Sequence, residues 1–196
     1  IGSFPIMILS LVIIIYFGFT KKDYDSTYII IYSYVFFIVG YLDDRYGINA
    51  YLKLGISTII IFLAINSVDF LVINKIYIKS LDKIVFLYNV KLFFTILCIL
   101  LLINALNLMD GINGLASGFA SAWMLSLSLI SNNEIIFGLL FILSIFTFIV
   151  TFQIIRGDYF LGDSGTLFLG CLVGLFTLYI YNNQLVNGNF IEVEKI

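Results

Sequence analysis

Long intervals without a charged side chain limit what this chain can fold into. Of its 196 residues, 62% are hydrophobic and 11% are charged, and the mean hydropathy is +1.11. A transmembrane helix needs about 20 mostly apolar residues, with about 17 as the practical minimum. Six of the seven intervals reach that length, and the shortest must borrow flanking residues. We therefore expect an all-α polytopic membrane protein with about seven transmembrane helices. The charge-free intervals are 1–20, 26–42, 54–68, 92–109, 111–133, 135–155 and 164–191.

One longer stretch between these intervals, 69–91, is expected to lie outside the bilayer. Two runs of β-branched and aromatic residues, 70–78 and 84–90, flank a charged centre at 79–83. This pattern predicts a short β-hairpin. Residues 1–196 are expected to form a single integral-membrane domain. We expect that domain to be truncated at both ends, because the chain starts with Ile and stops in a charged segment.

Composition also excludes several kinds of site. The net charge is −2, so we expect no basic surface for nucleic acid. The chain has no His, which removes the commonest metal ligand and general base. Cys98 and Cys171 are single cysteines inside apolar spans, where packing is a better explanation than a disulfide or catalysis.

Three acidic motifs stand out against this apolar background. They contain Asp43 with Asp44, Asp110, and Asp163. A carboxylate near lipid costs at least about 2–3 kcal/mol, so acidic residues in such places are usually functional. Two predicted spans separate the first motif from the second, and two more separate the second from the third. Because two crossings return a chain to the same side, we expect all three motifs on one face of the membrane and the hairpin on the other.

The first motif, Asp43-Asp44-Arg45, ends an apolar span. Adjacent residues of a helix point about 100° apart, so the two carboxylates can serve different partners, one a reactant and the other a cation. The alternative is a solvated helix end in which an Asp pairs with Arg45.

The second motif carries polar side chains at every third position, which places them on one stripe of a helix or broken helix. These residues are Asn104, Asn107, Asp110 and Asn113. Glycines within and after the stripe permit an unwound turn and the close approach of a ligand. Amides and carboxylates can read a base edge or coordinate a hard cation. The alternative is helix packing through small residues, with Asn hydrogen bonds between helices.

In the third motif, Gly162 and Gly165 flank Asp163 at the expected start of a helix. A helix N-terminus favours anions, and Asp163 could hold a metal against the same phosphate. The alternative is an ordinary Asp-Ser N-cap. No imidazole or thiolate accompanies these carboxylates and amides, so the donors suit Mg²⁺ or Mn²⁺. A hard cation on a membrane face indicates a diphosphate substrate whose acceptor lies in the bilayer.

The segments 41–47 (YLDDRYG), 104–116 (NALNLMDGINGLA) and 160–167 (FLGDSGTL) resemble the polyprenyl-phosphate N-acetylhexosamine-1-phosphate transferase family, also called glycosyltransferase family 4. The first segment is more similar to the undecaprenyl-phosphate N-acetylglucosamine-1-phosphate transferase branch than to the peptidoglycan translocase. The resemblance implies an enzyme that transfers N-acetylglucosamine-1-phosphate from a UDP-sugar to undecaprenyl phosphate, releases UMP and initiates cell-envelope polysaccharide synthesis. Transfer of phospho-N-acetylmuramoyl-pentapeptide is the alternative within the family.

The resemblance also implies roles for individual residues. Asp43 would activate or position the lipid phosphate, and Asp44 would assist in the phosphate–metal cluster. Asp163 would ligate Mg²⁺, or Mn²⁺ in its place, with Asn107 as its partner. The implied nucleotide-binding residues are Asp110, Gly111 and Asn113, and Lys53 is a candidate phosphate contact.

Three departures from the family pattern bear on these expectations. Asn113 stands where bacterial members usually have Asp, and Thr166 replaces a frequent Ser. The basic loop that contacts the donor phosphates in the family is missing after the third motif. We therefore expect residues 1–196 alone to release no UMP.

The resemblance implies a multi-pass protein of the bacterial inner (plasma) membrane with its active site on the cytoplasmic face. The lysine distribution disagrees, because the acidic face holds only Arg45, Lys53 and Arg156, while seven Lys lie on the other face. The positive-inside rule would therefore place the motifs outside the cytoplasm.

The expected partners are the UDP-sugar donor, the polyprenyl phosphate acceptor and the bilayer, with a homodimer left open. A secondary transporter is the alternative from another class, although the acids fall at span ends rather than at the midplane. A purely structural membrane subunit is a third possibility, and it predicts that the three acidic motifs can be replaced without consequence.

Overall fold

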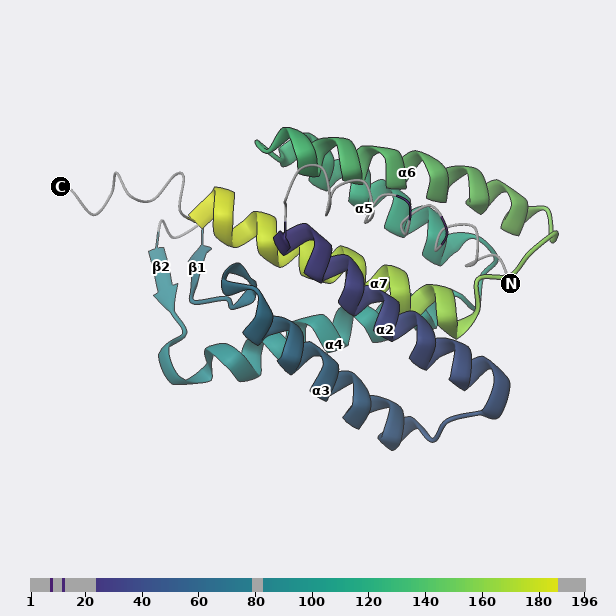
Figure 1. Cartoon of the computed structure of the whole chain (residues 1–196), viewed down its shortest axis with the longest axis horizontal. Coiled ribbons are helices and arrows are strands. Elements are labelled where there is room, and N and C mark those ends of the chain that lie inside the picture. The colour runs from purple at the N-terminus through teal and green to yellow at the C-terminus, as the bar shows by residue number, and fades with distance from the viewer. Residues whose placement is uncertain (1–7, 9–11, 13–23, 79–82, 187–196) are drawn as a thin grey trace.

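Figure 1 shows the computed structural model of the chain, which describes residues 8, 12, 24–78 and 83–186. Its fold is a bundle of α-helices with one small β-hairpin. The helices are α2 (Tyr24–Tyr46), α3 (Ala50–Ser67), α4 (Lys91–Met109), α5 (Leu115–Ile130), α6 (Glu134–Ile155) and α7 (Gly162–Ile180), which continues into a π-helical turn (Tyr181–Val186). The strands are β1 (Lys75–Ile78) and β2 (Lys83–Phe86), and short 3₁₀ turns occupy Asp69–Leu71 and Tyr88–Val90.

Five of these helices are long and apolar enough to cross a membrane, namely α2, α3, α4, α6 and α7 with its π-helical turn. This confirms the expected all-α polytopic membrane architecture for the described part of the chain. The expected first span, 1–20, lies outside the described residues apart from positions 8 and 12.

The expected span 111–133 is shorter than predicted, since α5 covers only 16 residues. At about 1.5 Å per residue it reaches about 24 Å, against a hydrocarbon core of about 30 Å. Turns replace its first residues, ending at Gly114 with φ +79°. At its other end Ser131 is extended, and Asn133 caps α6 by accepting a hydrogen bond from the Ile135 N–H at 2.9 Å. Glycine and Asn therefore break an interval that carries no charge.

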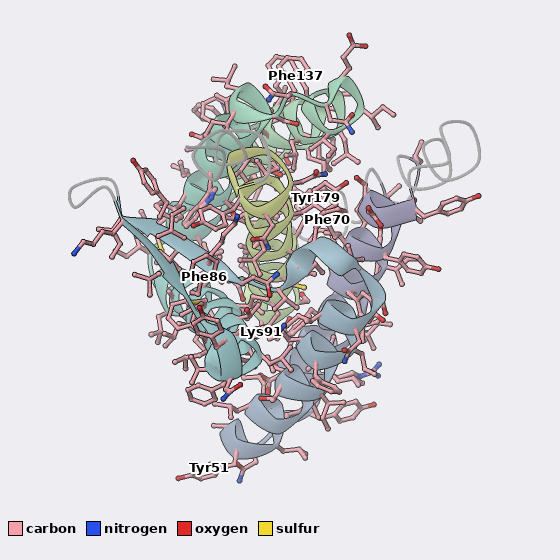
Figure 2. The ribbon with its side chains drawn as sticks, turned by 90° about the vertical axis from the view of Figure 1, so that its left-hand side faces the viewer. Tyr51, Phe70, Phe86, Lys91, Phe137 and Tyr179 are labelled. Carbon is pink, nitrogen blue, oxygen red and sulfur yellow. The ribbon has the colours of Figure 1, made fainter. Side chains whose placement is uncertain are left out.

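Helix α7 occupies the middle of the bundle, as Figure 2 shows in a view from the hairpin end. In α7, 89% of the most apolar 18-residue stretch is buried, whereas 22–44% of the corresponding stretch is buried in each of the other four spanning helices. Phe168 and Phe176 are among the largest fully buried side chains. Gly170 allows α4 to approach closely, because a Cβ there would lie 2.9 Å from the Cα of Ile103.

The hairpin expected within 69–91 is present, with strands of four residues each. The strands are antiparallel, with Lys75 opposite Phe86. The end of α7 holds the hairpin through Tyr181, whose hydroxyl accepts from the Tyr77 N–H at 3.3 Å and donates to the Lys75 carbonyl at 3.2 Å. Asn182 extends this attachment by donating to the carbonyls of the neighbouring segment, at residues 70 and 72.

The ends of α2, α4 and α6 and the starts of α3, α5 and α7 gather at the opposite end of the bundle from the hairpin (Figure 1). All three acidic motifs belong to these connections. The prediction that they lie together, drawn from counting membrane crossings, is confirmed.

Candidate functional site

A lysine joins two of the acidic motifs. The Lys53 Nζ lies 2.6 Å from Asp43 Oδ2 and 2.7 Å from Asp163 Oδ2. The side chains of Lys53, Asp43 and Asp163 are 22%, 9% and 32% exposed, so the bridge is partly shielded from water. One ammonium group thus holds carboxylates that are 120 positions apart, at the end of α2 and the start of α7.

The short connection between α2 and α3 builds this arrangement. Asn49 caps α3 by accepting from the Tyr51 N–H at 2.9 Å, which starts the helix close to the end of α2. The Ile48 N–H donates to Asp43 Oδ1 at 2.6 Å, so the second oxygen of this carboxylate holds the loop. Lys53 then lies on the first turn of α3 and reaches back over Asp43. The alternative that an Asp of this motif pairs with Arg45 is wrong for Asp43, because its partner is Lys53; the Arg45 guanidinium lies 5.7 Å from the ring centroid of Tyr46.

Asp44 meets a different partner from its neighbour. Its Oδ1 accepts from the Asp163 N–H at 2.8 Å, and its Oδ2 accepts from the Ser164 N–H at 3.0 Å. The two adjacent carboxylates thus have different partners, since Asp43 binds a cationic side chain and Asp44 binds the first turn of α7; that one of them meets a reactant stays a prediction. The alternative of an ordinary Asp-Ser N-cap is wrong, because the N-cap position of α7 is occupied by Leu161 and no side-chain hydrogen bond caps the helix from that position.

The second motif also reaches α7. Asn107 donates from Nδ2 to Thr166 Oγ1 at 3.2 Å, and it lies near enough to interact with the Asp163 carboxylate. Asp110 Oδ2 accepts from the Gly162 N–H at 3.2 Å. The interhelical hydrogen bond of Asn107 is of the kind that the packing alternative predicted, and it places the amide beside Asp163.

Burial raises the pKa of Asp110 to about 6, and the negative charges of Asp163 and Asp44 act in the same direction. The hydrogen bond from the Gly162 N–H opposes the shift. Asp110 follows α4 directly and is half-buried. Its carboxyl group therefore keeps its proton to a higher pH than an ordinary Asp does.

Other residues of the second motif are not brought against α7. Gly111 and Asn113 are exposed in the turns between α4 and α5, where they leave an open surface next to Asp110. Asn104 is exposed as well, and its Nδ2 donates to the Leu100 carbonyl of its own helix at 2.8 Å. The predicted stripe is thus divided, with Asn107 and Asp110 facing α7.

Gly40 is a site residue that sequence reasoning missed. A Cβ at this position would collide with the backbone of Asp163 and Ser164, so only glycine lets α2 come this close to α7. Its spacing of four from Asp44 is the one signal in the sequence, because residues i and i+4 share a helix face.

The donors at this site fit a hard divalent cation. Two carboxylate oxygens, from Asp43 and Asp163, already converge on the cationic nitrogen of Lys53, and the Asn107 amide is adjacent. Within residues 24–78 and 83–186, no three Asp, Glu, His or Cys side chains form a complete metal cage. Mg²⁺ is commonly bound by one or two carboxylates, with waters and substrate phosphates completing its shell, so the chemistry of these donors is compatible with it.

The chain is similar to known proteins over most of its length. The profile of glycosyl transferase family 4 matches residues 26–181, which include all three acidic motifs. The chain is also 28% identical over 163 residues to a protein of Bacillus subtilis (strain 168) named probable undecaprenyl-phosphate N-acetylglucosaminyl 1-phosphate transferase. That match covers 78% of this chain and 43% of the relative, so the chain spans less than half the length of this relative.

Proposed function

The chain belongs to glycosyl transferase family 4, and from this premise we propose that the protein is an enzyme that transfers a sugar-1-phosphate from a UDP-sugar to undecaprenyl phosphate. The sugar we propose is N-acetylglucosamine, because the relative's name specifies an N-acetylglucosaminyl 1-phosphate transferase. The observation that carries the proposal is the convergence of Asp43 and Asp163 on Lys53 at one end of an apolar bundle. Such an end can receive a lipid phosphate from the bilayer and a nucleotide from water.

In this reaction an oxygen of the lipid phosphate attacks the phosphorus that carries the sugar. The bond from that phosphorus to the bridging oxygen breaks, and UMP leaves with the electron pair. Asp43 would lie beside the attacking phosphate and orient it. A phosphate monoester, whose second pKa is about 6, is mostly deprotonated at neutral pH, so Asp43 has at most one remaining proton to accept.

Lys53 contributes positive charge where the phosphates meet. Its ammonium group carries three donors, two of which hold Asp43 and Asp163. The third donor is available to a phosphate oxygen, and this supports the expected phosphate contact. Bringing two anionic substrates together needs such preorganised positive charge.

Asp163 and Asn107 would hold Mg²⁺, and Asp43 lies near enough to share it. Bound there, the cation would neutralise charge on the transferred phosphoryl group and on the departing UMP. Asp110, with the exposed Gly111 and Asn113, supplies the open polar surface that we assign to the nucleotide. Because UDP-sugars are made in the cytoplasm, we place this end of the bundle at the cytoplasmic face of the plasma membrane.

The test is UMP release by the purified full-length protein from a panel of UDP-sugars, with undecaprenyl phosphate and Mg²⁺. We expect release with UDP-N-acetylglucosamine that depends on both the lipid and the cation. The Asp163→Asn variant, which keeps the side-chain shape but removes its charge, should lose the activity while remaining folded. Release only from UDP-N-acetylmuramoyl-pentapeptide would reassign the donor, and no release from any donor would refute the proposal.

A further inference from the structure

We propose that Asp44 is a positioning residue, which fixes the Asp163 carboxylate by capping the first turn of α7 and contacts neither substrate nor metal. The inference rests on the proposed function for one point, the role of Asp163 in holding the metal. The capping by Asp44 does not depend on that function, because the hydrogen bonds show it directly. It replaces the expectation that Asp44 belongs to the phosphate–metal cluster.

The first argument is the hydrogen bonding at the start of α7. The first N–H groups of any helix lack partners within the helix, and Leu161, which precedes α7, provides no side-chain cap. One Asp44 carboxylate accepts from two successive N–H groups, at 2.8 Å from Asp163 and 3.0 Å from Ser164. Its Oδ1 is therefore engaged by the backbone of Asp163, whose side chain reaches Lys53, and its Oδ2 is engaged by the backbone of the next residue.

The second argument is the shape of the two helices where they meet. Gly40 lies one helical turn before Asp44 on the same face of α2, and a Cβ there would collide with the backbone of Asp163 and Ser164. Opposite it, Gly162 has φ +69°, and a Cβ there would lie 2.9 Å from Asp44 Oδ2. Glycines on both sides thus allow the carboxylate to reach the amides.

The third argument is electrostatic. A negative charge at a helix N-terminus interacts favourably with the partial positive charge of the exposed N–H groups. Asp110 adds a second carboxylate by accepting from the Gly162 N–H at 3.2 Å. Three successive N–H groups of α7 are therefore used by carboxylates from other elements. A substrate phosphate must find its donors elsewhere, and the Lys53 ammonium group, which contacts the Asp163 side chain, is one such donor.

Hydrogen exchange measures the capping directly. In the full-length protein, Asp44→Ala should speed exchange of the amides at the start of α7 by about tenfold or more, because their acceptor is gone. Asp43→Asn is the matched control, since it alters the neighbouring carboxylate and should leave these amides protected. Unchanged exchange in Asp44→Ala would overturn the capping.

Turnover then separates positioning from direct participation. Asn offers one acceptor oxygen where Asp offers two, so Asp44→Asn should keep one of the two caps and retain UMP release within about tenfold of wild type, whereas Asp44→Ala should lose about a hundredfold. Asp163→Asn, which loses a charge that we assign to the metal, should be inactive. An Asp44→Asn variant as inactive as Asp163→Asn, with protected amides, would show that the charge acts directly. If wild type itself released no UMP, the proposed function would fail, and the exchange data would still decide the capping.

A second variant tests the same contact without altering a carboxylate. Gly40→Ala should push α2 away from α7, expose the same amides to exchange and lower turnover, with the loss mainly in kcat. Gly55→Ala on α3, where a Cβ meets nothing within 4 Å, is the control and should behave as wild type. Normal exchange and turnover in Gly40→Ala would contradict the close approach on which the capping depends.

Discussion

Asp43 and Asp44 are neighbours in the sequence, yet each is held by a different part of the molecule. Asp43 binds Lys53 and the loop after α2, while Asp44 binds the backbone of α7. Lys53 is the residue on which the charge balance depends, because it is shared between Asp43 and Asp163. Removing a shared cation leaves two partly shielded carboxylates facing each other, which is unfavourable.

We expect Lys53→Met to lower the stability of the metal-free protein by about 1–2 kcal/mol. Added Mg²⁺ should raise the melting temperature of this variant more than that of wild type, because the cation relieves the repulsion between Asp43 and Asp163. Thermal unfolding in detergent, with and without Mg²⁺, measures both effects. Arg45→Met is the control, and an equal loss of stability in the two variants would speak against the bridge.

Asp110 gives a pH-dependent prediction. Its pKa is raised from 3.8 to about 6, so the folded protein binds this proton more tightly than the unfolded chain. The resulting stabilisation is present in full below pH 3.8 and is lost as the pH rises through about 6. Asp110→Asn has no such loss. The melting temperature of Asp110→Asn minus that of wild type should therefore increase as the pH rises from about 4 to about 7 in Mg²⁺-free buffer. A melting-temperature difference that is independent of pH would contradict the raised pKa of Asp110.

At the scale of elements, contact between α4 and α7 depends on Gly170. A Cβ there would lie 2.9 Å from the Cα of Ile103, one helical turn before Asn107. Gly170→Ala should force the helices apart and lower stability by about 1–3 kcal/mol, and it should also lower turnover by moving Asn107. Gly138→Ala on α6 has open space and should cost nothing. Thermal unfolding and UMP release of the pair test this, and equal behaviour of the two variants would argue against tight packing.

The sequence predicted the elements better than the contacts between them. Charge-free intervals located the described spanning helices, and the β-branched runs located the hairpin, because both signals are local. Counting crossings placed the three motifs at one end. The caps of α7 by Asp44 and Asp110 could not be predicted, since they depend on how closely α2 approaches α7. For Lys53 the family resemblance predicts only a phosphate contact, because nothing local in the sequence shows that it joins residues 43 and 163.

At the scale of the whole molecule, the acidic end and the hairpin end should lie on opposite sides of the membrane. Single cysteines at Tyr46 and Phe160, which are 70% and 63% exposed, mark the acidic end, and one at the exposed Lys83 marks the hairpin. With Cys98 and Cys171 replaced, an impermeant thiol reagent added to sealed vesicles should label the first two from one side and the third from the other. Labelling from the cytoplasmic side at Tyr46 would support the proposed orientation over the lysine count. Labelling of Tyr46 and Phe160 from opposite sides would refute the shared end.

The central position of α7 has a consequence for biosynthesis. A chain emerges from the ribosome N-terminus first, so α2 to α6 reach the membrane before α7 does. Until α7 arrives, Asp44 and Asp110 lack the amides that they accept from, and Gly40 faces no partner helix. The nascent bundle should therefore remain open and sensitive to quality-control proteases. The acidic end of the bundle closes only when α7 enters between α2 and α4, which were made more than 50 residues earlier, and this step brings Asp163 to Lys53.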